Sequence, residues 1–122
     1  MTGTWSHMTA ADLGRDIDKG KINPVELTEY FLAEIEAHPH RDRIYARTTA
    51  LRARGEAVAA ASRAKSGMRR HPLDGVPLSW KDLFDTAGVA TEAGSALLKG
   101  RIPTRDAAVL ATATLMGSVY LG

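Results

Sequence analysis

Apolar side chains recur at helical spacing in the first half of the chain. Leu27, Phe31 and Ile35 lie four positions apart and would form one apolar face of a helix. The glutamates of this segment lie off that face. Asn23 can cap the start of this helix, and Pro24 suits its first position, where a missing N–H costs nothing. The helix is expected to end near His38, because the residue before a proline resists helical geometry.

Two other helices are predicted around this one. Thr9 and Asp12 resemble a capping box that opens a short helix, for which Gly20 is a plausible end. Residues 49–66 are rich in alanine, which favours a helix with a thin apolar face that ends at Gly67. Between the helices, residues 41–48 are expected to be an extended connection.

The second half of the chain changes to a strand pattern. From Leu73 to Asp82 a turn leads into a strand whose side chains alternate, with Lys81 at its end. Glycines and small polar residues predict turns next, and Asp106 is expected to cap a further helix. The apolar side of that helix is expected at Val109, Leu110, Leu115 and Met116. Residues 119–121 read as a short apolar strand.

The predicted fold class is therefore α/β. Residues 9–70 form an N-terminal helical arm, and residues 71–122 form a strand–loop–helix–strand unit of a parallel sheet. The handedness rule predicts that this crossover is right-handed. There is no internal repeat or low-complexity linker, so residues 1–122 are expected to belong to a single domain.

The composition excludes several classes of site. The 122 residues include no cysteine, which rules out disulfides, thiolate metal sites and cysteine nucleophiles. No apolar run approaches the ~20 residues that a membrane helix needs. Residues 1–8 do not have the pattern of a signal peptide. A cytoplasmic protein without membrane contact is the expectation.

Charge is unevenly spread along the chain. Residues 41–70 carry nine basic and two acidic side chains, a local net of +7, against +2 for the whole chain. Such a stretch could bind nucleic acid, but only one aromatic residue, Tyr45, is interleaved and no nucleic-acid motif is present. We expect no nucleic-acid partner, and a small basic interaction domain is the non-enzymatic alternative.

Few side chains offer chemistry by spacing alone. The histidines at 7, 38, 40 and 71 lack helical metal spacing, and no glycine pattern forms a phosphate cradle, so neither metal nor cofactor is expected. Ser95 lacks a nucleophile elbow and is better interpreted as a turn or capping serine. Lys81 reads on spacing alone as a solvated strand end.

A series of motifs changes the interpretation of Lys81. Residues 73–82 (LDGVPLSWKD) are followed by DTAG at 85–88, TEAGS at 91–95, RDAAV at 105–109 and GSVYLG at 117–122. Their order and gaps resemble the opening of the amidase signature family. The segment NPVEL at 23–27 also resembles the N-terminus of that family, so the likeness covers nearly the whole chain.

The resemblance implies a hydrolase that cleaves carboxamide C–N bonds with a Ser–cis-Ser–Lys triad. It implies that Lys81 is the general base, and burial beside Trp80 and Phe84 would favour its neutral form. Ser79, on the same side of the strand, could hydrogen-bond within such a site. The implied substrate is a small-molecule amide, and the resemblance leaves a homodimer open. The alternative within the family is the amidase-like subunit of the tRNA-dependent amidotransferase, which would bring partner subunits and glutamine.

The chain departs from the family in what it lacks. Its eleven glycines are never adjacent, so neither Gly-Gly-Ser segment that carries the two serines and the oxyanion hole is present. We therefore expect a truncated sheet, an N-terminal fragment that is inactive alone, and apolar surface on the last helix and strand. Which amide is the substrate does not follow from these residues.

Overall fold

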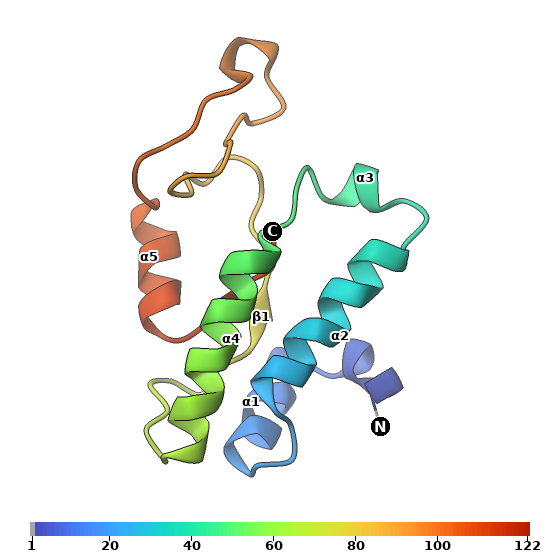
Figure 1. Cartoon of the computed structure of the whole chain (residues 1–122), viewed down its shortest axis with the longest axis vertical. Coiled ribbons are helices and arrows are strands. Elements are labelled where there is room, and N and C mark those ends of the chain that lie inside the picture. The colour runs from blue at the N-terminus through green and yellow to red at the C-terminus, as the bar shows by residue number, and fades with distance from the viewer. Residues whose placement is uncertain (1) are drawn as a thin grey trace.

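The computed structural model describes residues 2–122 and sets a group of helices beside a small parallel sheet (Figure 1). A 3-10 turn η1 (Thr2–His7) precedes α1 (Ala10–Asp18), α2 (Pro24–Ala37), α3 (Arg41–Ile44) and α4 (Ala50–Lys65). After these come β1 (Pro77–Leu78), the 3-10 turn η2 (Ala96–Leu98), α5 (Ala108–Leu115) and β2 (Val119–Tyr120).

The predicted helix boundaries in the first half are confirmed. Thr9 Oγ1 accepts a hydrogen bond from the Asp12 amide at 3.1 Å, and Asn23 Oδ1 accepts one from the Val25 amide at 2.8 Å. Pro24 is the first residue of α2. Past the end of α4, Gly67 takes a φ of +69°, a conformation that glycine adopts without steric cost.

Two expectations for the middle of the chain were wrong. Residues 41–44 form the helical turn α3 rather than an extended connection, because the amides at 44 and 45 bond back to His40 and Arg41. The strand expected from the turn at Leu73 to the lysine is reduced to Pro77–Leu78. The stretch that pairs with β2 is short, because the chain turns again at Lys81.

The sheet has the predicted parallel arrangement. Pro77 lies opposite Val119 and Leu78 opposite Tyr120, which confirms the strand–loop–helix–strand order of the second half. The connection between the strands extends away from the sheet and returns through α5 (Figure 1). Its part between Lys81 and α5, residues 82–107, is called the excursion below and contains η2.

The buried side chains join the helices to the strands in two clusters. One comprises Trp5, Leu13, Ile17, Ile22, Leu27 and Val76. The other comprises Leu32, Ala53, Ala57, Val119 and Leu121. Because the alanines of α4 are small, α2 packs closely along it, and both helices pack on the strands. The helical arm is thus part of the same packed unit as the sheet.

The last helix differs from its prediction. Asp106 does not cap α5, because its carboxylate instead binds Arg52 and the Ala87 amide. Of the four residues expected on its apolar side, only Leu110 is buried, and Val109, Leu115 and Met116 are exposed. Apolar surface was expected on both the last helix and the last strand. The exposed side chains confirm it for the helix, but β2 is buried, so it was wrong for the strand.

Candidate functional site

Lys81 lies at a turn just beyond the sheet. The amide of the preceding residue, Trp80, donates to the Gly122 carbonyl at 2.9 Å. The Lys81 carbonyl then accepts hydrogen bonds from the amides of Leu83 at 2.7 Å and Phe84 at 3.2 Å. The lysine therefore follows a residue that is bonded to the end of the sheet and opens a tight turn, three residues after the end of β1.

The Lys81 side chain is exposed in this chain. Trp80 and Phe84 pack edge to face, with their ring centroids 5.4 Å apart, so the two aromatic residues do gather beside the lysine. They remain half-buried and do not enclose the ammonium. The burial expected for a catalytic base is thus not supplied by the described residues.

Ser79 forms a contact that the sequence did not specify. Its hydroxyl hydrogen-bonds the hydroxyl of Tyr45, which lies in the connection between α3 and α4. Ser79 was expected to hydrogen-bond within a catalytic site, whereas the partner observed here is a tyrosine of the helical arm. Tyr45 and Ser79 also line a hollow of about 330 Å³ with Trp5, Phe31 and Leu121 among its walls.

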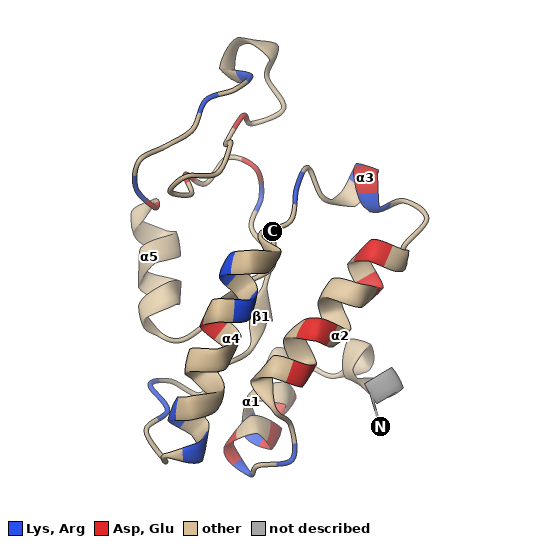
Figure 2. Ribbon diagram, in the orientation of Figure 1, with Lys and Arg blue, Asp and Glu red and all other residues tan. Residues whose placement is uncertain are grey.

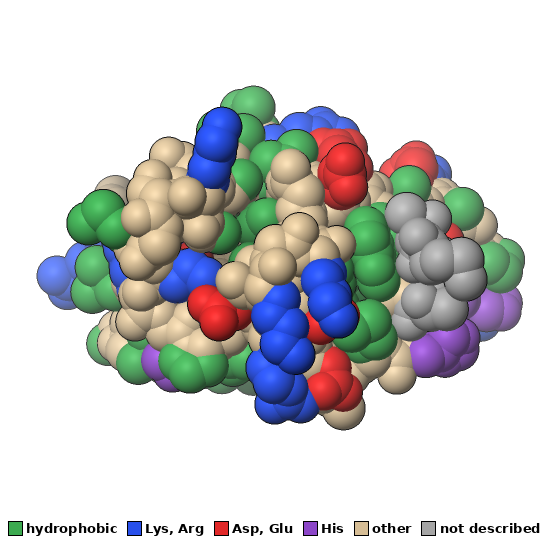
Figure 3. Space-filling view, turned by 90° about the horizontal axis from the view of Figure 1, so that it is seen from below, with side chains coloured by type: hydrophobic (Ala, Val, Ile, Leu, Met, Phe, Trp, Pro, Cys, Tyr) green, Lys and Arg blue, Asp and Glu red, His purple; other side chains and the backbone are tan. Residues whose placement is uncertain are grey.

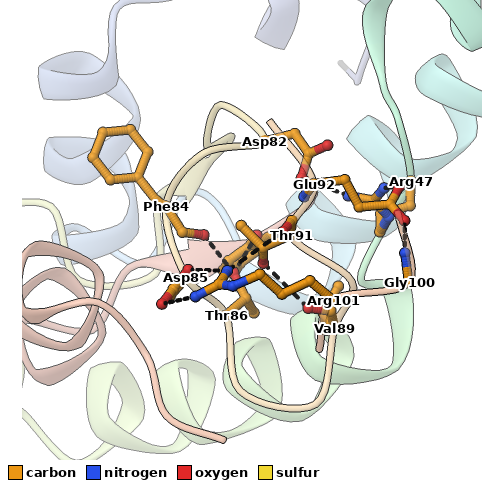
Figure 4. Close-up of polar contacts among 11 residues, drawn as sticks. Arg47, Asp82, Phe84, Asp85, Thr86, Val89, Thr91, Glu92, Gly100 and Arg101 are labelled. Carbon is orange, nitrogen blue, oxygen red and sulfur yellow. Dashed lines mark hydrogen bonds and ion pairs between the residues drawn. The ribbon is translucent and has the colours of Figure 1, made fainter. Parts of the chain in front are cut away.

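A set of arginine–carboxylate pairs follows the lysine (Figure 4). Arg47 bridges Asp82 at 2.8 Å and Glu92 at 3.1 Å. Further along, both oxygens of Asp85 accept hydrogen bonds from Arg101, which hold the pKa of that carboxyl below its usual value. These contacts fold the excursion after Lys81 back on itself.

A second arginine joins the excursion to the helices. Arg52 of α4 binds both oxygens of Asp106, at 3.1 and 3.0 Å, and its guanidinium lies 5.0 Å from the ring centroid of Tyr120. The Arg52 hydrogen bonds lower the pKa of Asp106. Sequence reasoning missed these partners. The one available signal for such ion pairs was the charge pattern: a basic run at 41–70, followed by acidic residues after Lys81.

The remaining candidates serve local structure. The Ser95 hydroxyl accepts from the Leu97 amide at 3.3 Å and caps η2, as its interpretation as a capping serine predicted. His38 and His71 each accept a backbone N–H at Nδ1. Across residues 2–122 no three His, Asp or Glu side chains are grouped as metal ligands. Within that range no helix is both long and apolar enough to span a membrane.

The sequence matches a known family model. The model described as Amidase covers residues 26–122. A curated relative, a glutamyl-tRNA(Gln) amidotransferase subunit from Anaeromyxobacter dehalogenans, is 41% identical over 91% of this chain and 23% of its own length. The corresponding subunit from Streptomyces coelicolor is 36% identical over 94% of this chain and 23% of its own. The chain thus spans less than a quarter of these relatives.

A solved structure shares the fold. The native peptide amidase from Stenotrophomonas maltophilia superposes with a TM-score of 0.87 and is 31% identical. The alignment covers 97% of this chain and 24% of the peptide amidase. The arrangement of helices and strands described above is therefore that of one part of a larger enzyme fold.

Proposed function

Because the chain belongs to the Amidase family, we propose that it forms the lysine-bearing part of an enzyme that hydrolyses carboxamide C–N bonds. The observation that carries the proposal is the place of Lys81, three residues beyond the paired strand β1 and inside the matched range. A small-molecule amide is the proposed substrate, and the cytoplasm the proposed site of action.

In this proposal Lys81 is the general base. Its neutral amine takes a proton from the cis serine, which in turn takes one from the nucleophilic serine as that serine attacks the amide carbon. The C–N bond then breaks, the leaving amine receives the proton, and water later hydrolyses the acyl-enzyme. Both serines and the oxyanion hole would lie in segments that this chain does not contain.

The exposure of Lys81 is consistent with a site whose other parts come from segments outside this chain. A lysine acts as a base only when its neutral form is populated, and burial beside apolar groups favours that form. Other segments would have to cover Lys81, Trp80 and Phe84 to provide that environment.

The test is amine release from a simple aryl amide, together with the coding sequence after codon 122. We expect no release by the 122-residue chain, and an in-frame continuation into a Gly-Gly-Ser-rich segment whose product does release amine. Turnover by the 122-residue chain that is abolished in Lys81→Ala would contradict the division of the triad.

A second candidate function is amide transfer within an amidotransferase complex of several subunits. The observation that favours it is that the curated relatives at 41% and 36% identity are named as glutamyl-tRNA(Gln) amidotransferase subunits. This function would require partner subunits and a glutamine ammonia donor. Co-purification of the encoded protein with two further subunits would support it, whereas a stable free-standing amidase would exclude it.

A further inference from the structure

Side chains hold the excursion after Lys81 against the rest of the fold. Before the lysine, the Trp80 amide is bonded to the Gly122 carbonyl at 2.9 Å, which holds this side against the end of the sheet. Between the lysine and α5, where every residue is described, backbone hydrogen bonds join points of the excursion to each other, such as Thr91 to Arg101 at 2.9 Å. None of those bonds reaches the helical arm or β2. Backbone bonds within the excursion hold its own shape, so side-chain contacts are needed to hold it against the rest of the fold.

Next to the lysine, Arg47 supplies such contacts. Its Nη1 donates to Asp82 Oδ1 at 2.8 Å, and its Nη2 donates to Glu92 Oε1 at 3.1 Å (Figure 4). Asp82 Oδ1 also accepts from the Glu92 amide at 3.2 Å, and the other Glu92 oxygen accepts from the Gly100 amide. One guanidinium thus joins the residue after the lysine to a point ten residues further along.

The three side chains of this bridge are shielded from solvent. Arg47, Asp82 and Glu92 are only 28%, 23% and 25% exposed. Ion pairs that are partly buried are screened less by salt and hold their geometry better than surface pairs. The planar guanidinium can donate in two directions at once, which a lysine ammonium on a flexible stem does not reproduce.

The segment that carries Arg47 is itself fixed on the sheet. Thr49 donates from its amide to the Leu121 carbonyl and from its hydroxyl to the Tyr120 carbonyl, both at 2.8 Å. Two residues before Arg47, the Tyr45 hydroxyl bonds Ser79. Residues 45–49 therefore contact the chain on both sides of Lys81 while anchored to β2.

We propose that Arg47 is a positioning residue for Lys81. By tying Asp82 and Glu92 to a segment anchored on β2, it sets the turn that presents the lysine. The catalytic role of Lys81 in this inference rests on the proposed function. The claim that Arg47 holds the turn after Lys81 rests only on the contacts above.

The first test is amide hydrogen exchange in the 122-residue chain. Arg47→Gln is expected to raise exchange at Leu83, Phe84, Glu92 and Gly100 about tenfold, because their turn loses its bridge. Amides of the sheet, at Val119 and Leu121, should keep their wild-type rates. The matched control is Arg54→Gln, which removes an exposed ion pair to Glu29 on the helices. Unchanged exchange at Leu83 and Phe84 in Arg47→Gln would overturn the proposal.

If Arg47→Gln does not fold, Glu92→Gln replaces it, because that change removes only the far arm of the bridge. It should raise exchange at Gly100 and the Lys81 turn while the sheet amides stay protected. Wild-type exchange at the turn in a folded Glu92→Gln chain would equally overturn the proposal.

The second test is catalytic and uses the polypeptide encoded in frame with this segment. Arg47→Gln should lower kcat about tenfold and leave KM within about twofold, because the base is misplaced while substrate binding is not. A loss confined to KM would contradict a positioning role. If Lys81→Ala keeps full activity, the proposed function fails, but the exchange result still decides the geometry.

Discussion

At the scale of single residues, Asp74 shows how one buried charge holds the start of the lysine segment. Its side chain is fully buried, and Arg63 binds both of its oxygens, at 2.8 and 2.7 Å. The Arg70 amide adds a third hydrogen bond at 2.9 Å. Burial raises the pKa of this carboxyl, but the hydrogen bonds and the arginine charges outweigh it, and the net pKa is lowered.

Asp74→Asn is expected to destabilise the chain by about 3 kcal/mol at pH 7, because it leaves the Arg63 charge without its partner. The lowered pKa means that this stabilisation is complete above the unfolded value of 3.8 and is lost as pH falls through the folded value. The difference between wild type and variant in urea unfolding should therefore shrink below about pH 4.

The matched control is Asp42→Asn, since Asp42 is 94% exposed and makes only a 3.7 Å contact with Arg41. It should change the free energy of unfolding by less than about 0.5 kcal/mol. Equal effects of the two substitutions would contradict the account of Asp74.

The sequence indicated the backbone at Asp74 but not its side-chain partner. Asp74-Gly75 is a turn signal, and the turn is present, since the Asp74 amide bonds to His71 at 2.9 Å. Asp106 likewise has the local features of a helix cap, yet it binds Arg52. Local propensity cannot reveal a partner that lies 54 positions away, which only the packed fold brings close.

At the scale of elements, two helix-interior glycines have opposite surroundings. Gly14 of α1 faces Pro72, and a Cβ there would lie 2.1 Å from the Pro72 carbonyl oxygen. Gly55 of α4 has nothing within 4 Å of an added Cβ. The first glycine permits α1 to pack against the start of the lysine segment, whereas the second only costs helix stability.

Gly14→Ala should lower the free energy of unfolding by about 2 kcal/mol through overpacking. Gly55→Ala should raise it by about 0.5 kcal/mol or more, because alanine loses less entropy in a helix. Thermal unfolding of both variants beside wild type measures the contrast. An increase in both would show that the close approach of α1 to Pro72 is absent in solution.

The lengths of the elements were predicted less well than their order. Residues 41–44 were missed because a four-residue helix leaves no periodic pattern. The lysine strand was overestimated because alternation persists through Trp80 although the backbone already turns at Lys81. Strong caps at Thr9 and Asn23 made the first two helices predictable.

At the scale of the whole molecule, the basic stretch and the acidic stretches neutralise each other. Acidic residues of α2 lie beside basic residues of α4 (Figure 2), and Arg54 binds Glu29 across that boundary. Figure 3 shows acidic side chains among the basic ones on the lower face. Other arginines of the stretch pair with carboxylates elsewhere: Arg41, Arg47, Arg52, Arg63 and Arg69.

This pairing predicts weak interaction with nucleic acid. Arginines that are already paired with carboxylates neutralise few phosphates and so release few counterions from DNA. A gel shift with a short DNA duplex at low salt should therefore show no complex. A shift whose affinity falls steeply with salt would favour the basic interaction domain over an enzyme part.

The account as a whole depends on Lys81 being a catalytic base rather than a solvated strand end. The direct measurement is kcat/KM for an aryl amide in the polypeptide encoded in frame with this segment, comparing Lys81→Ala with Lys99→Ala, an exposed lysine beside η2. We predict a loss of about 1000-fold or more in Lys81→Ala and wild-type activity in Lys99→Ala. Undiminished activity in Lys81→Ala would contradict the account.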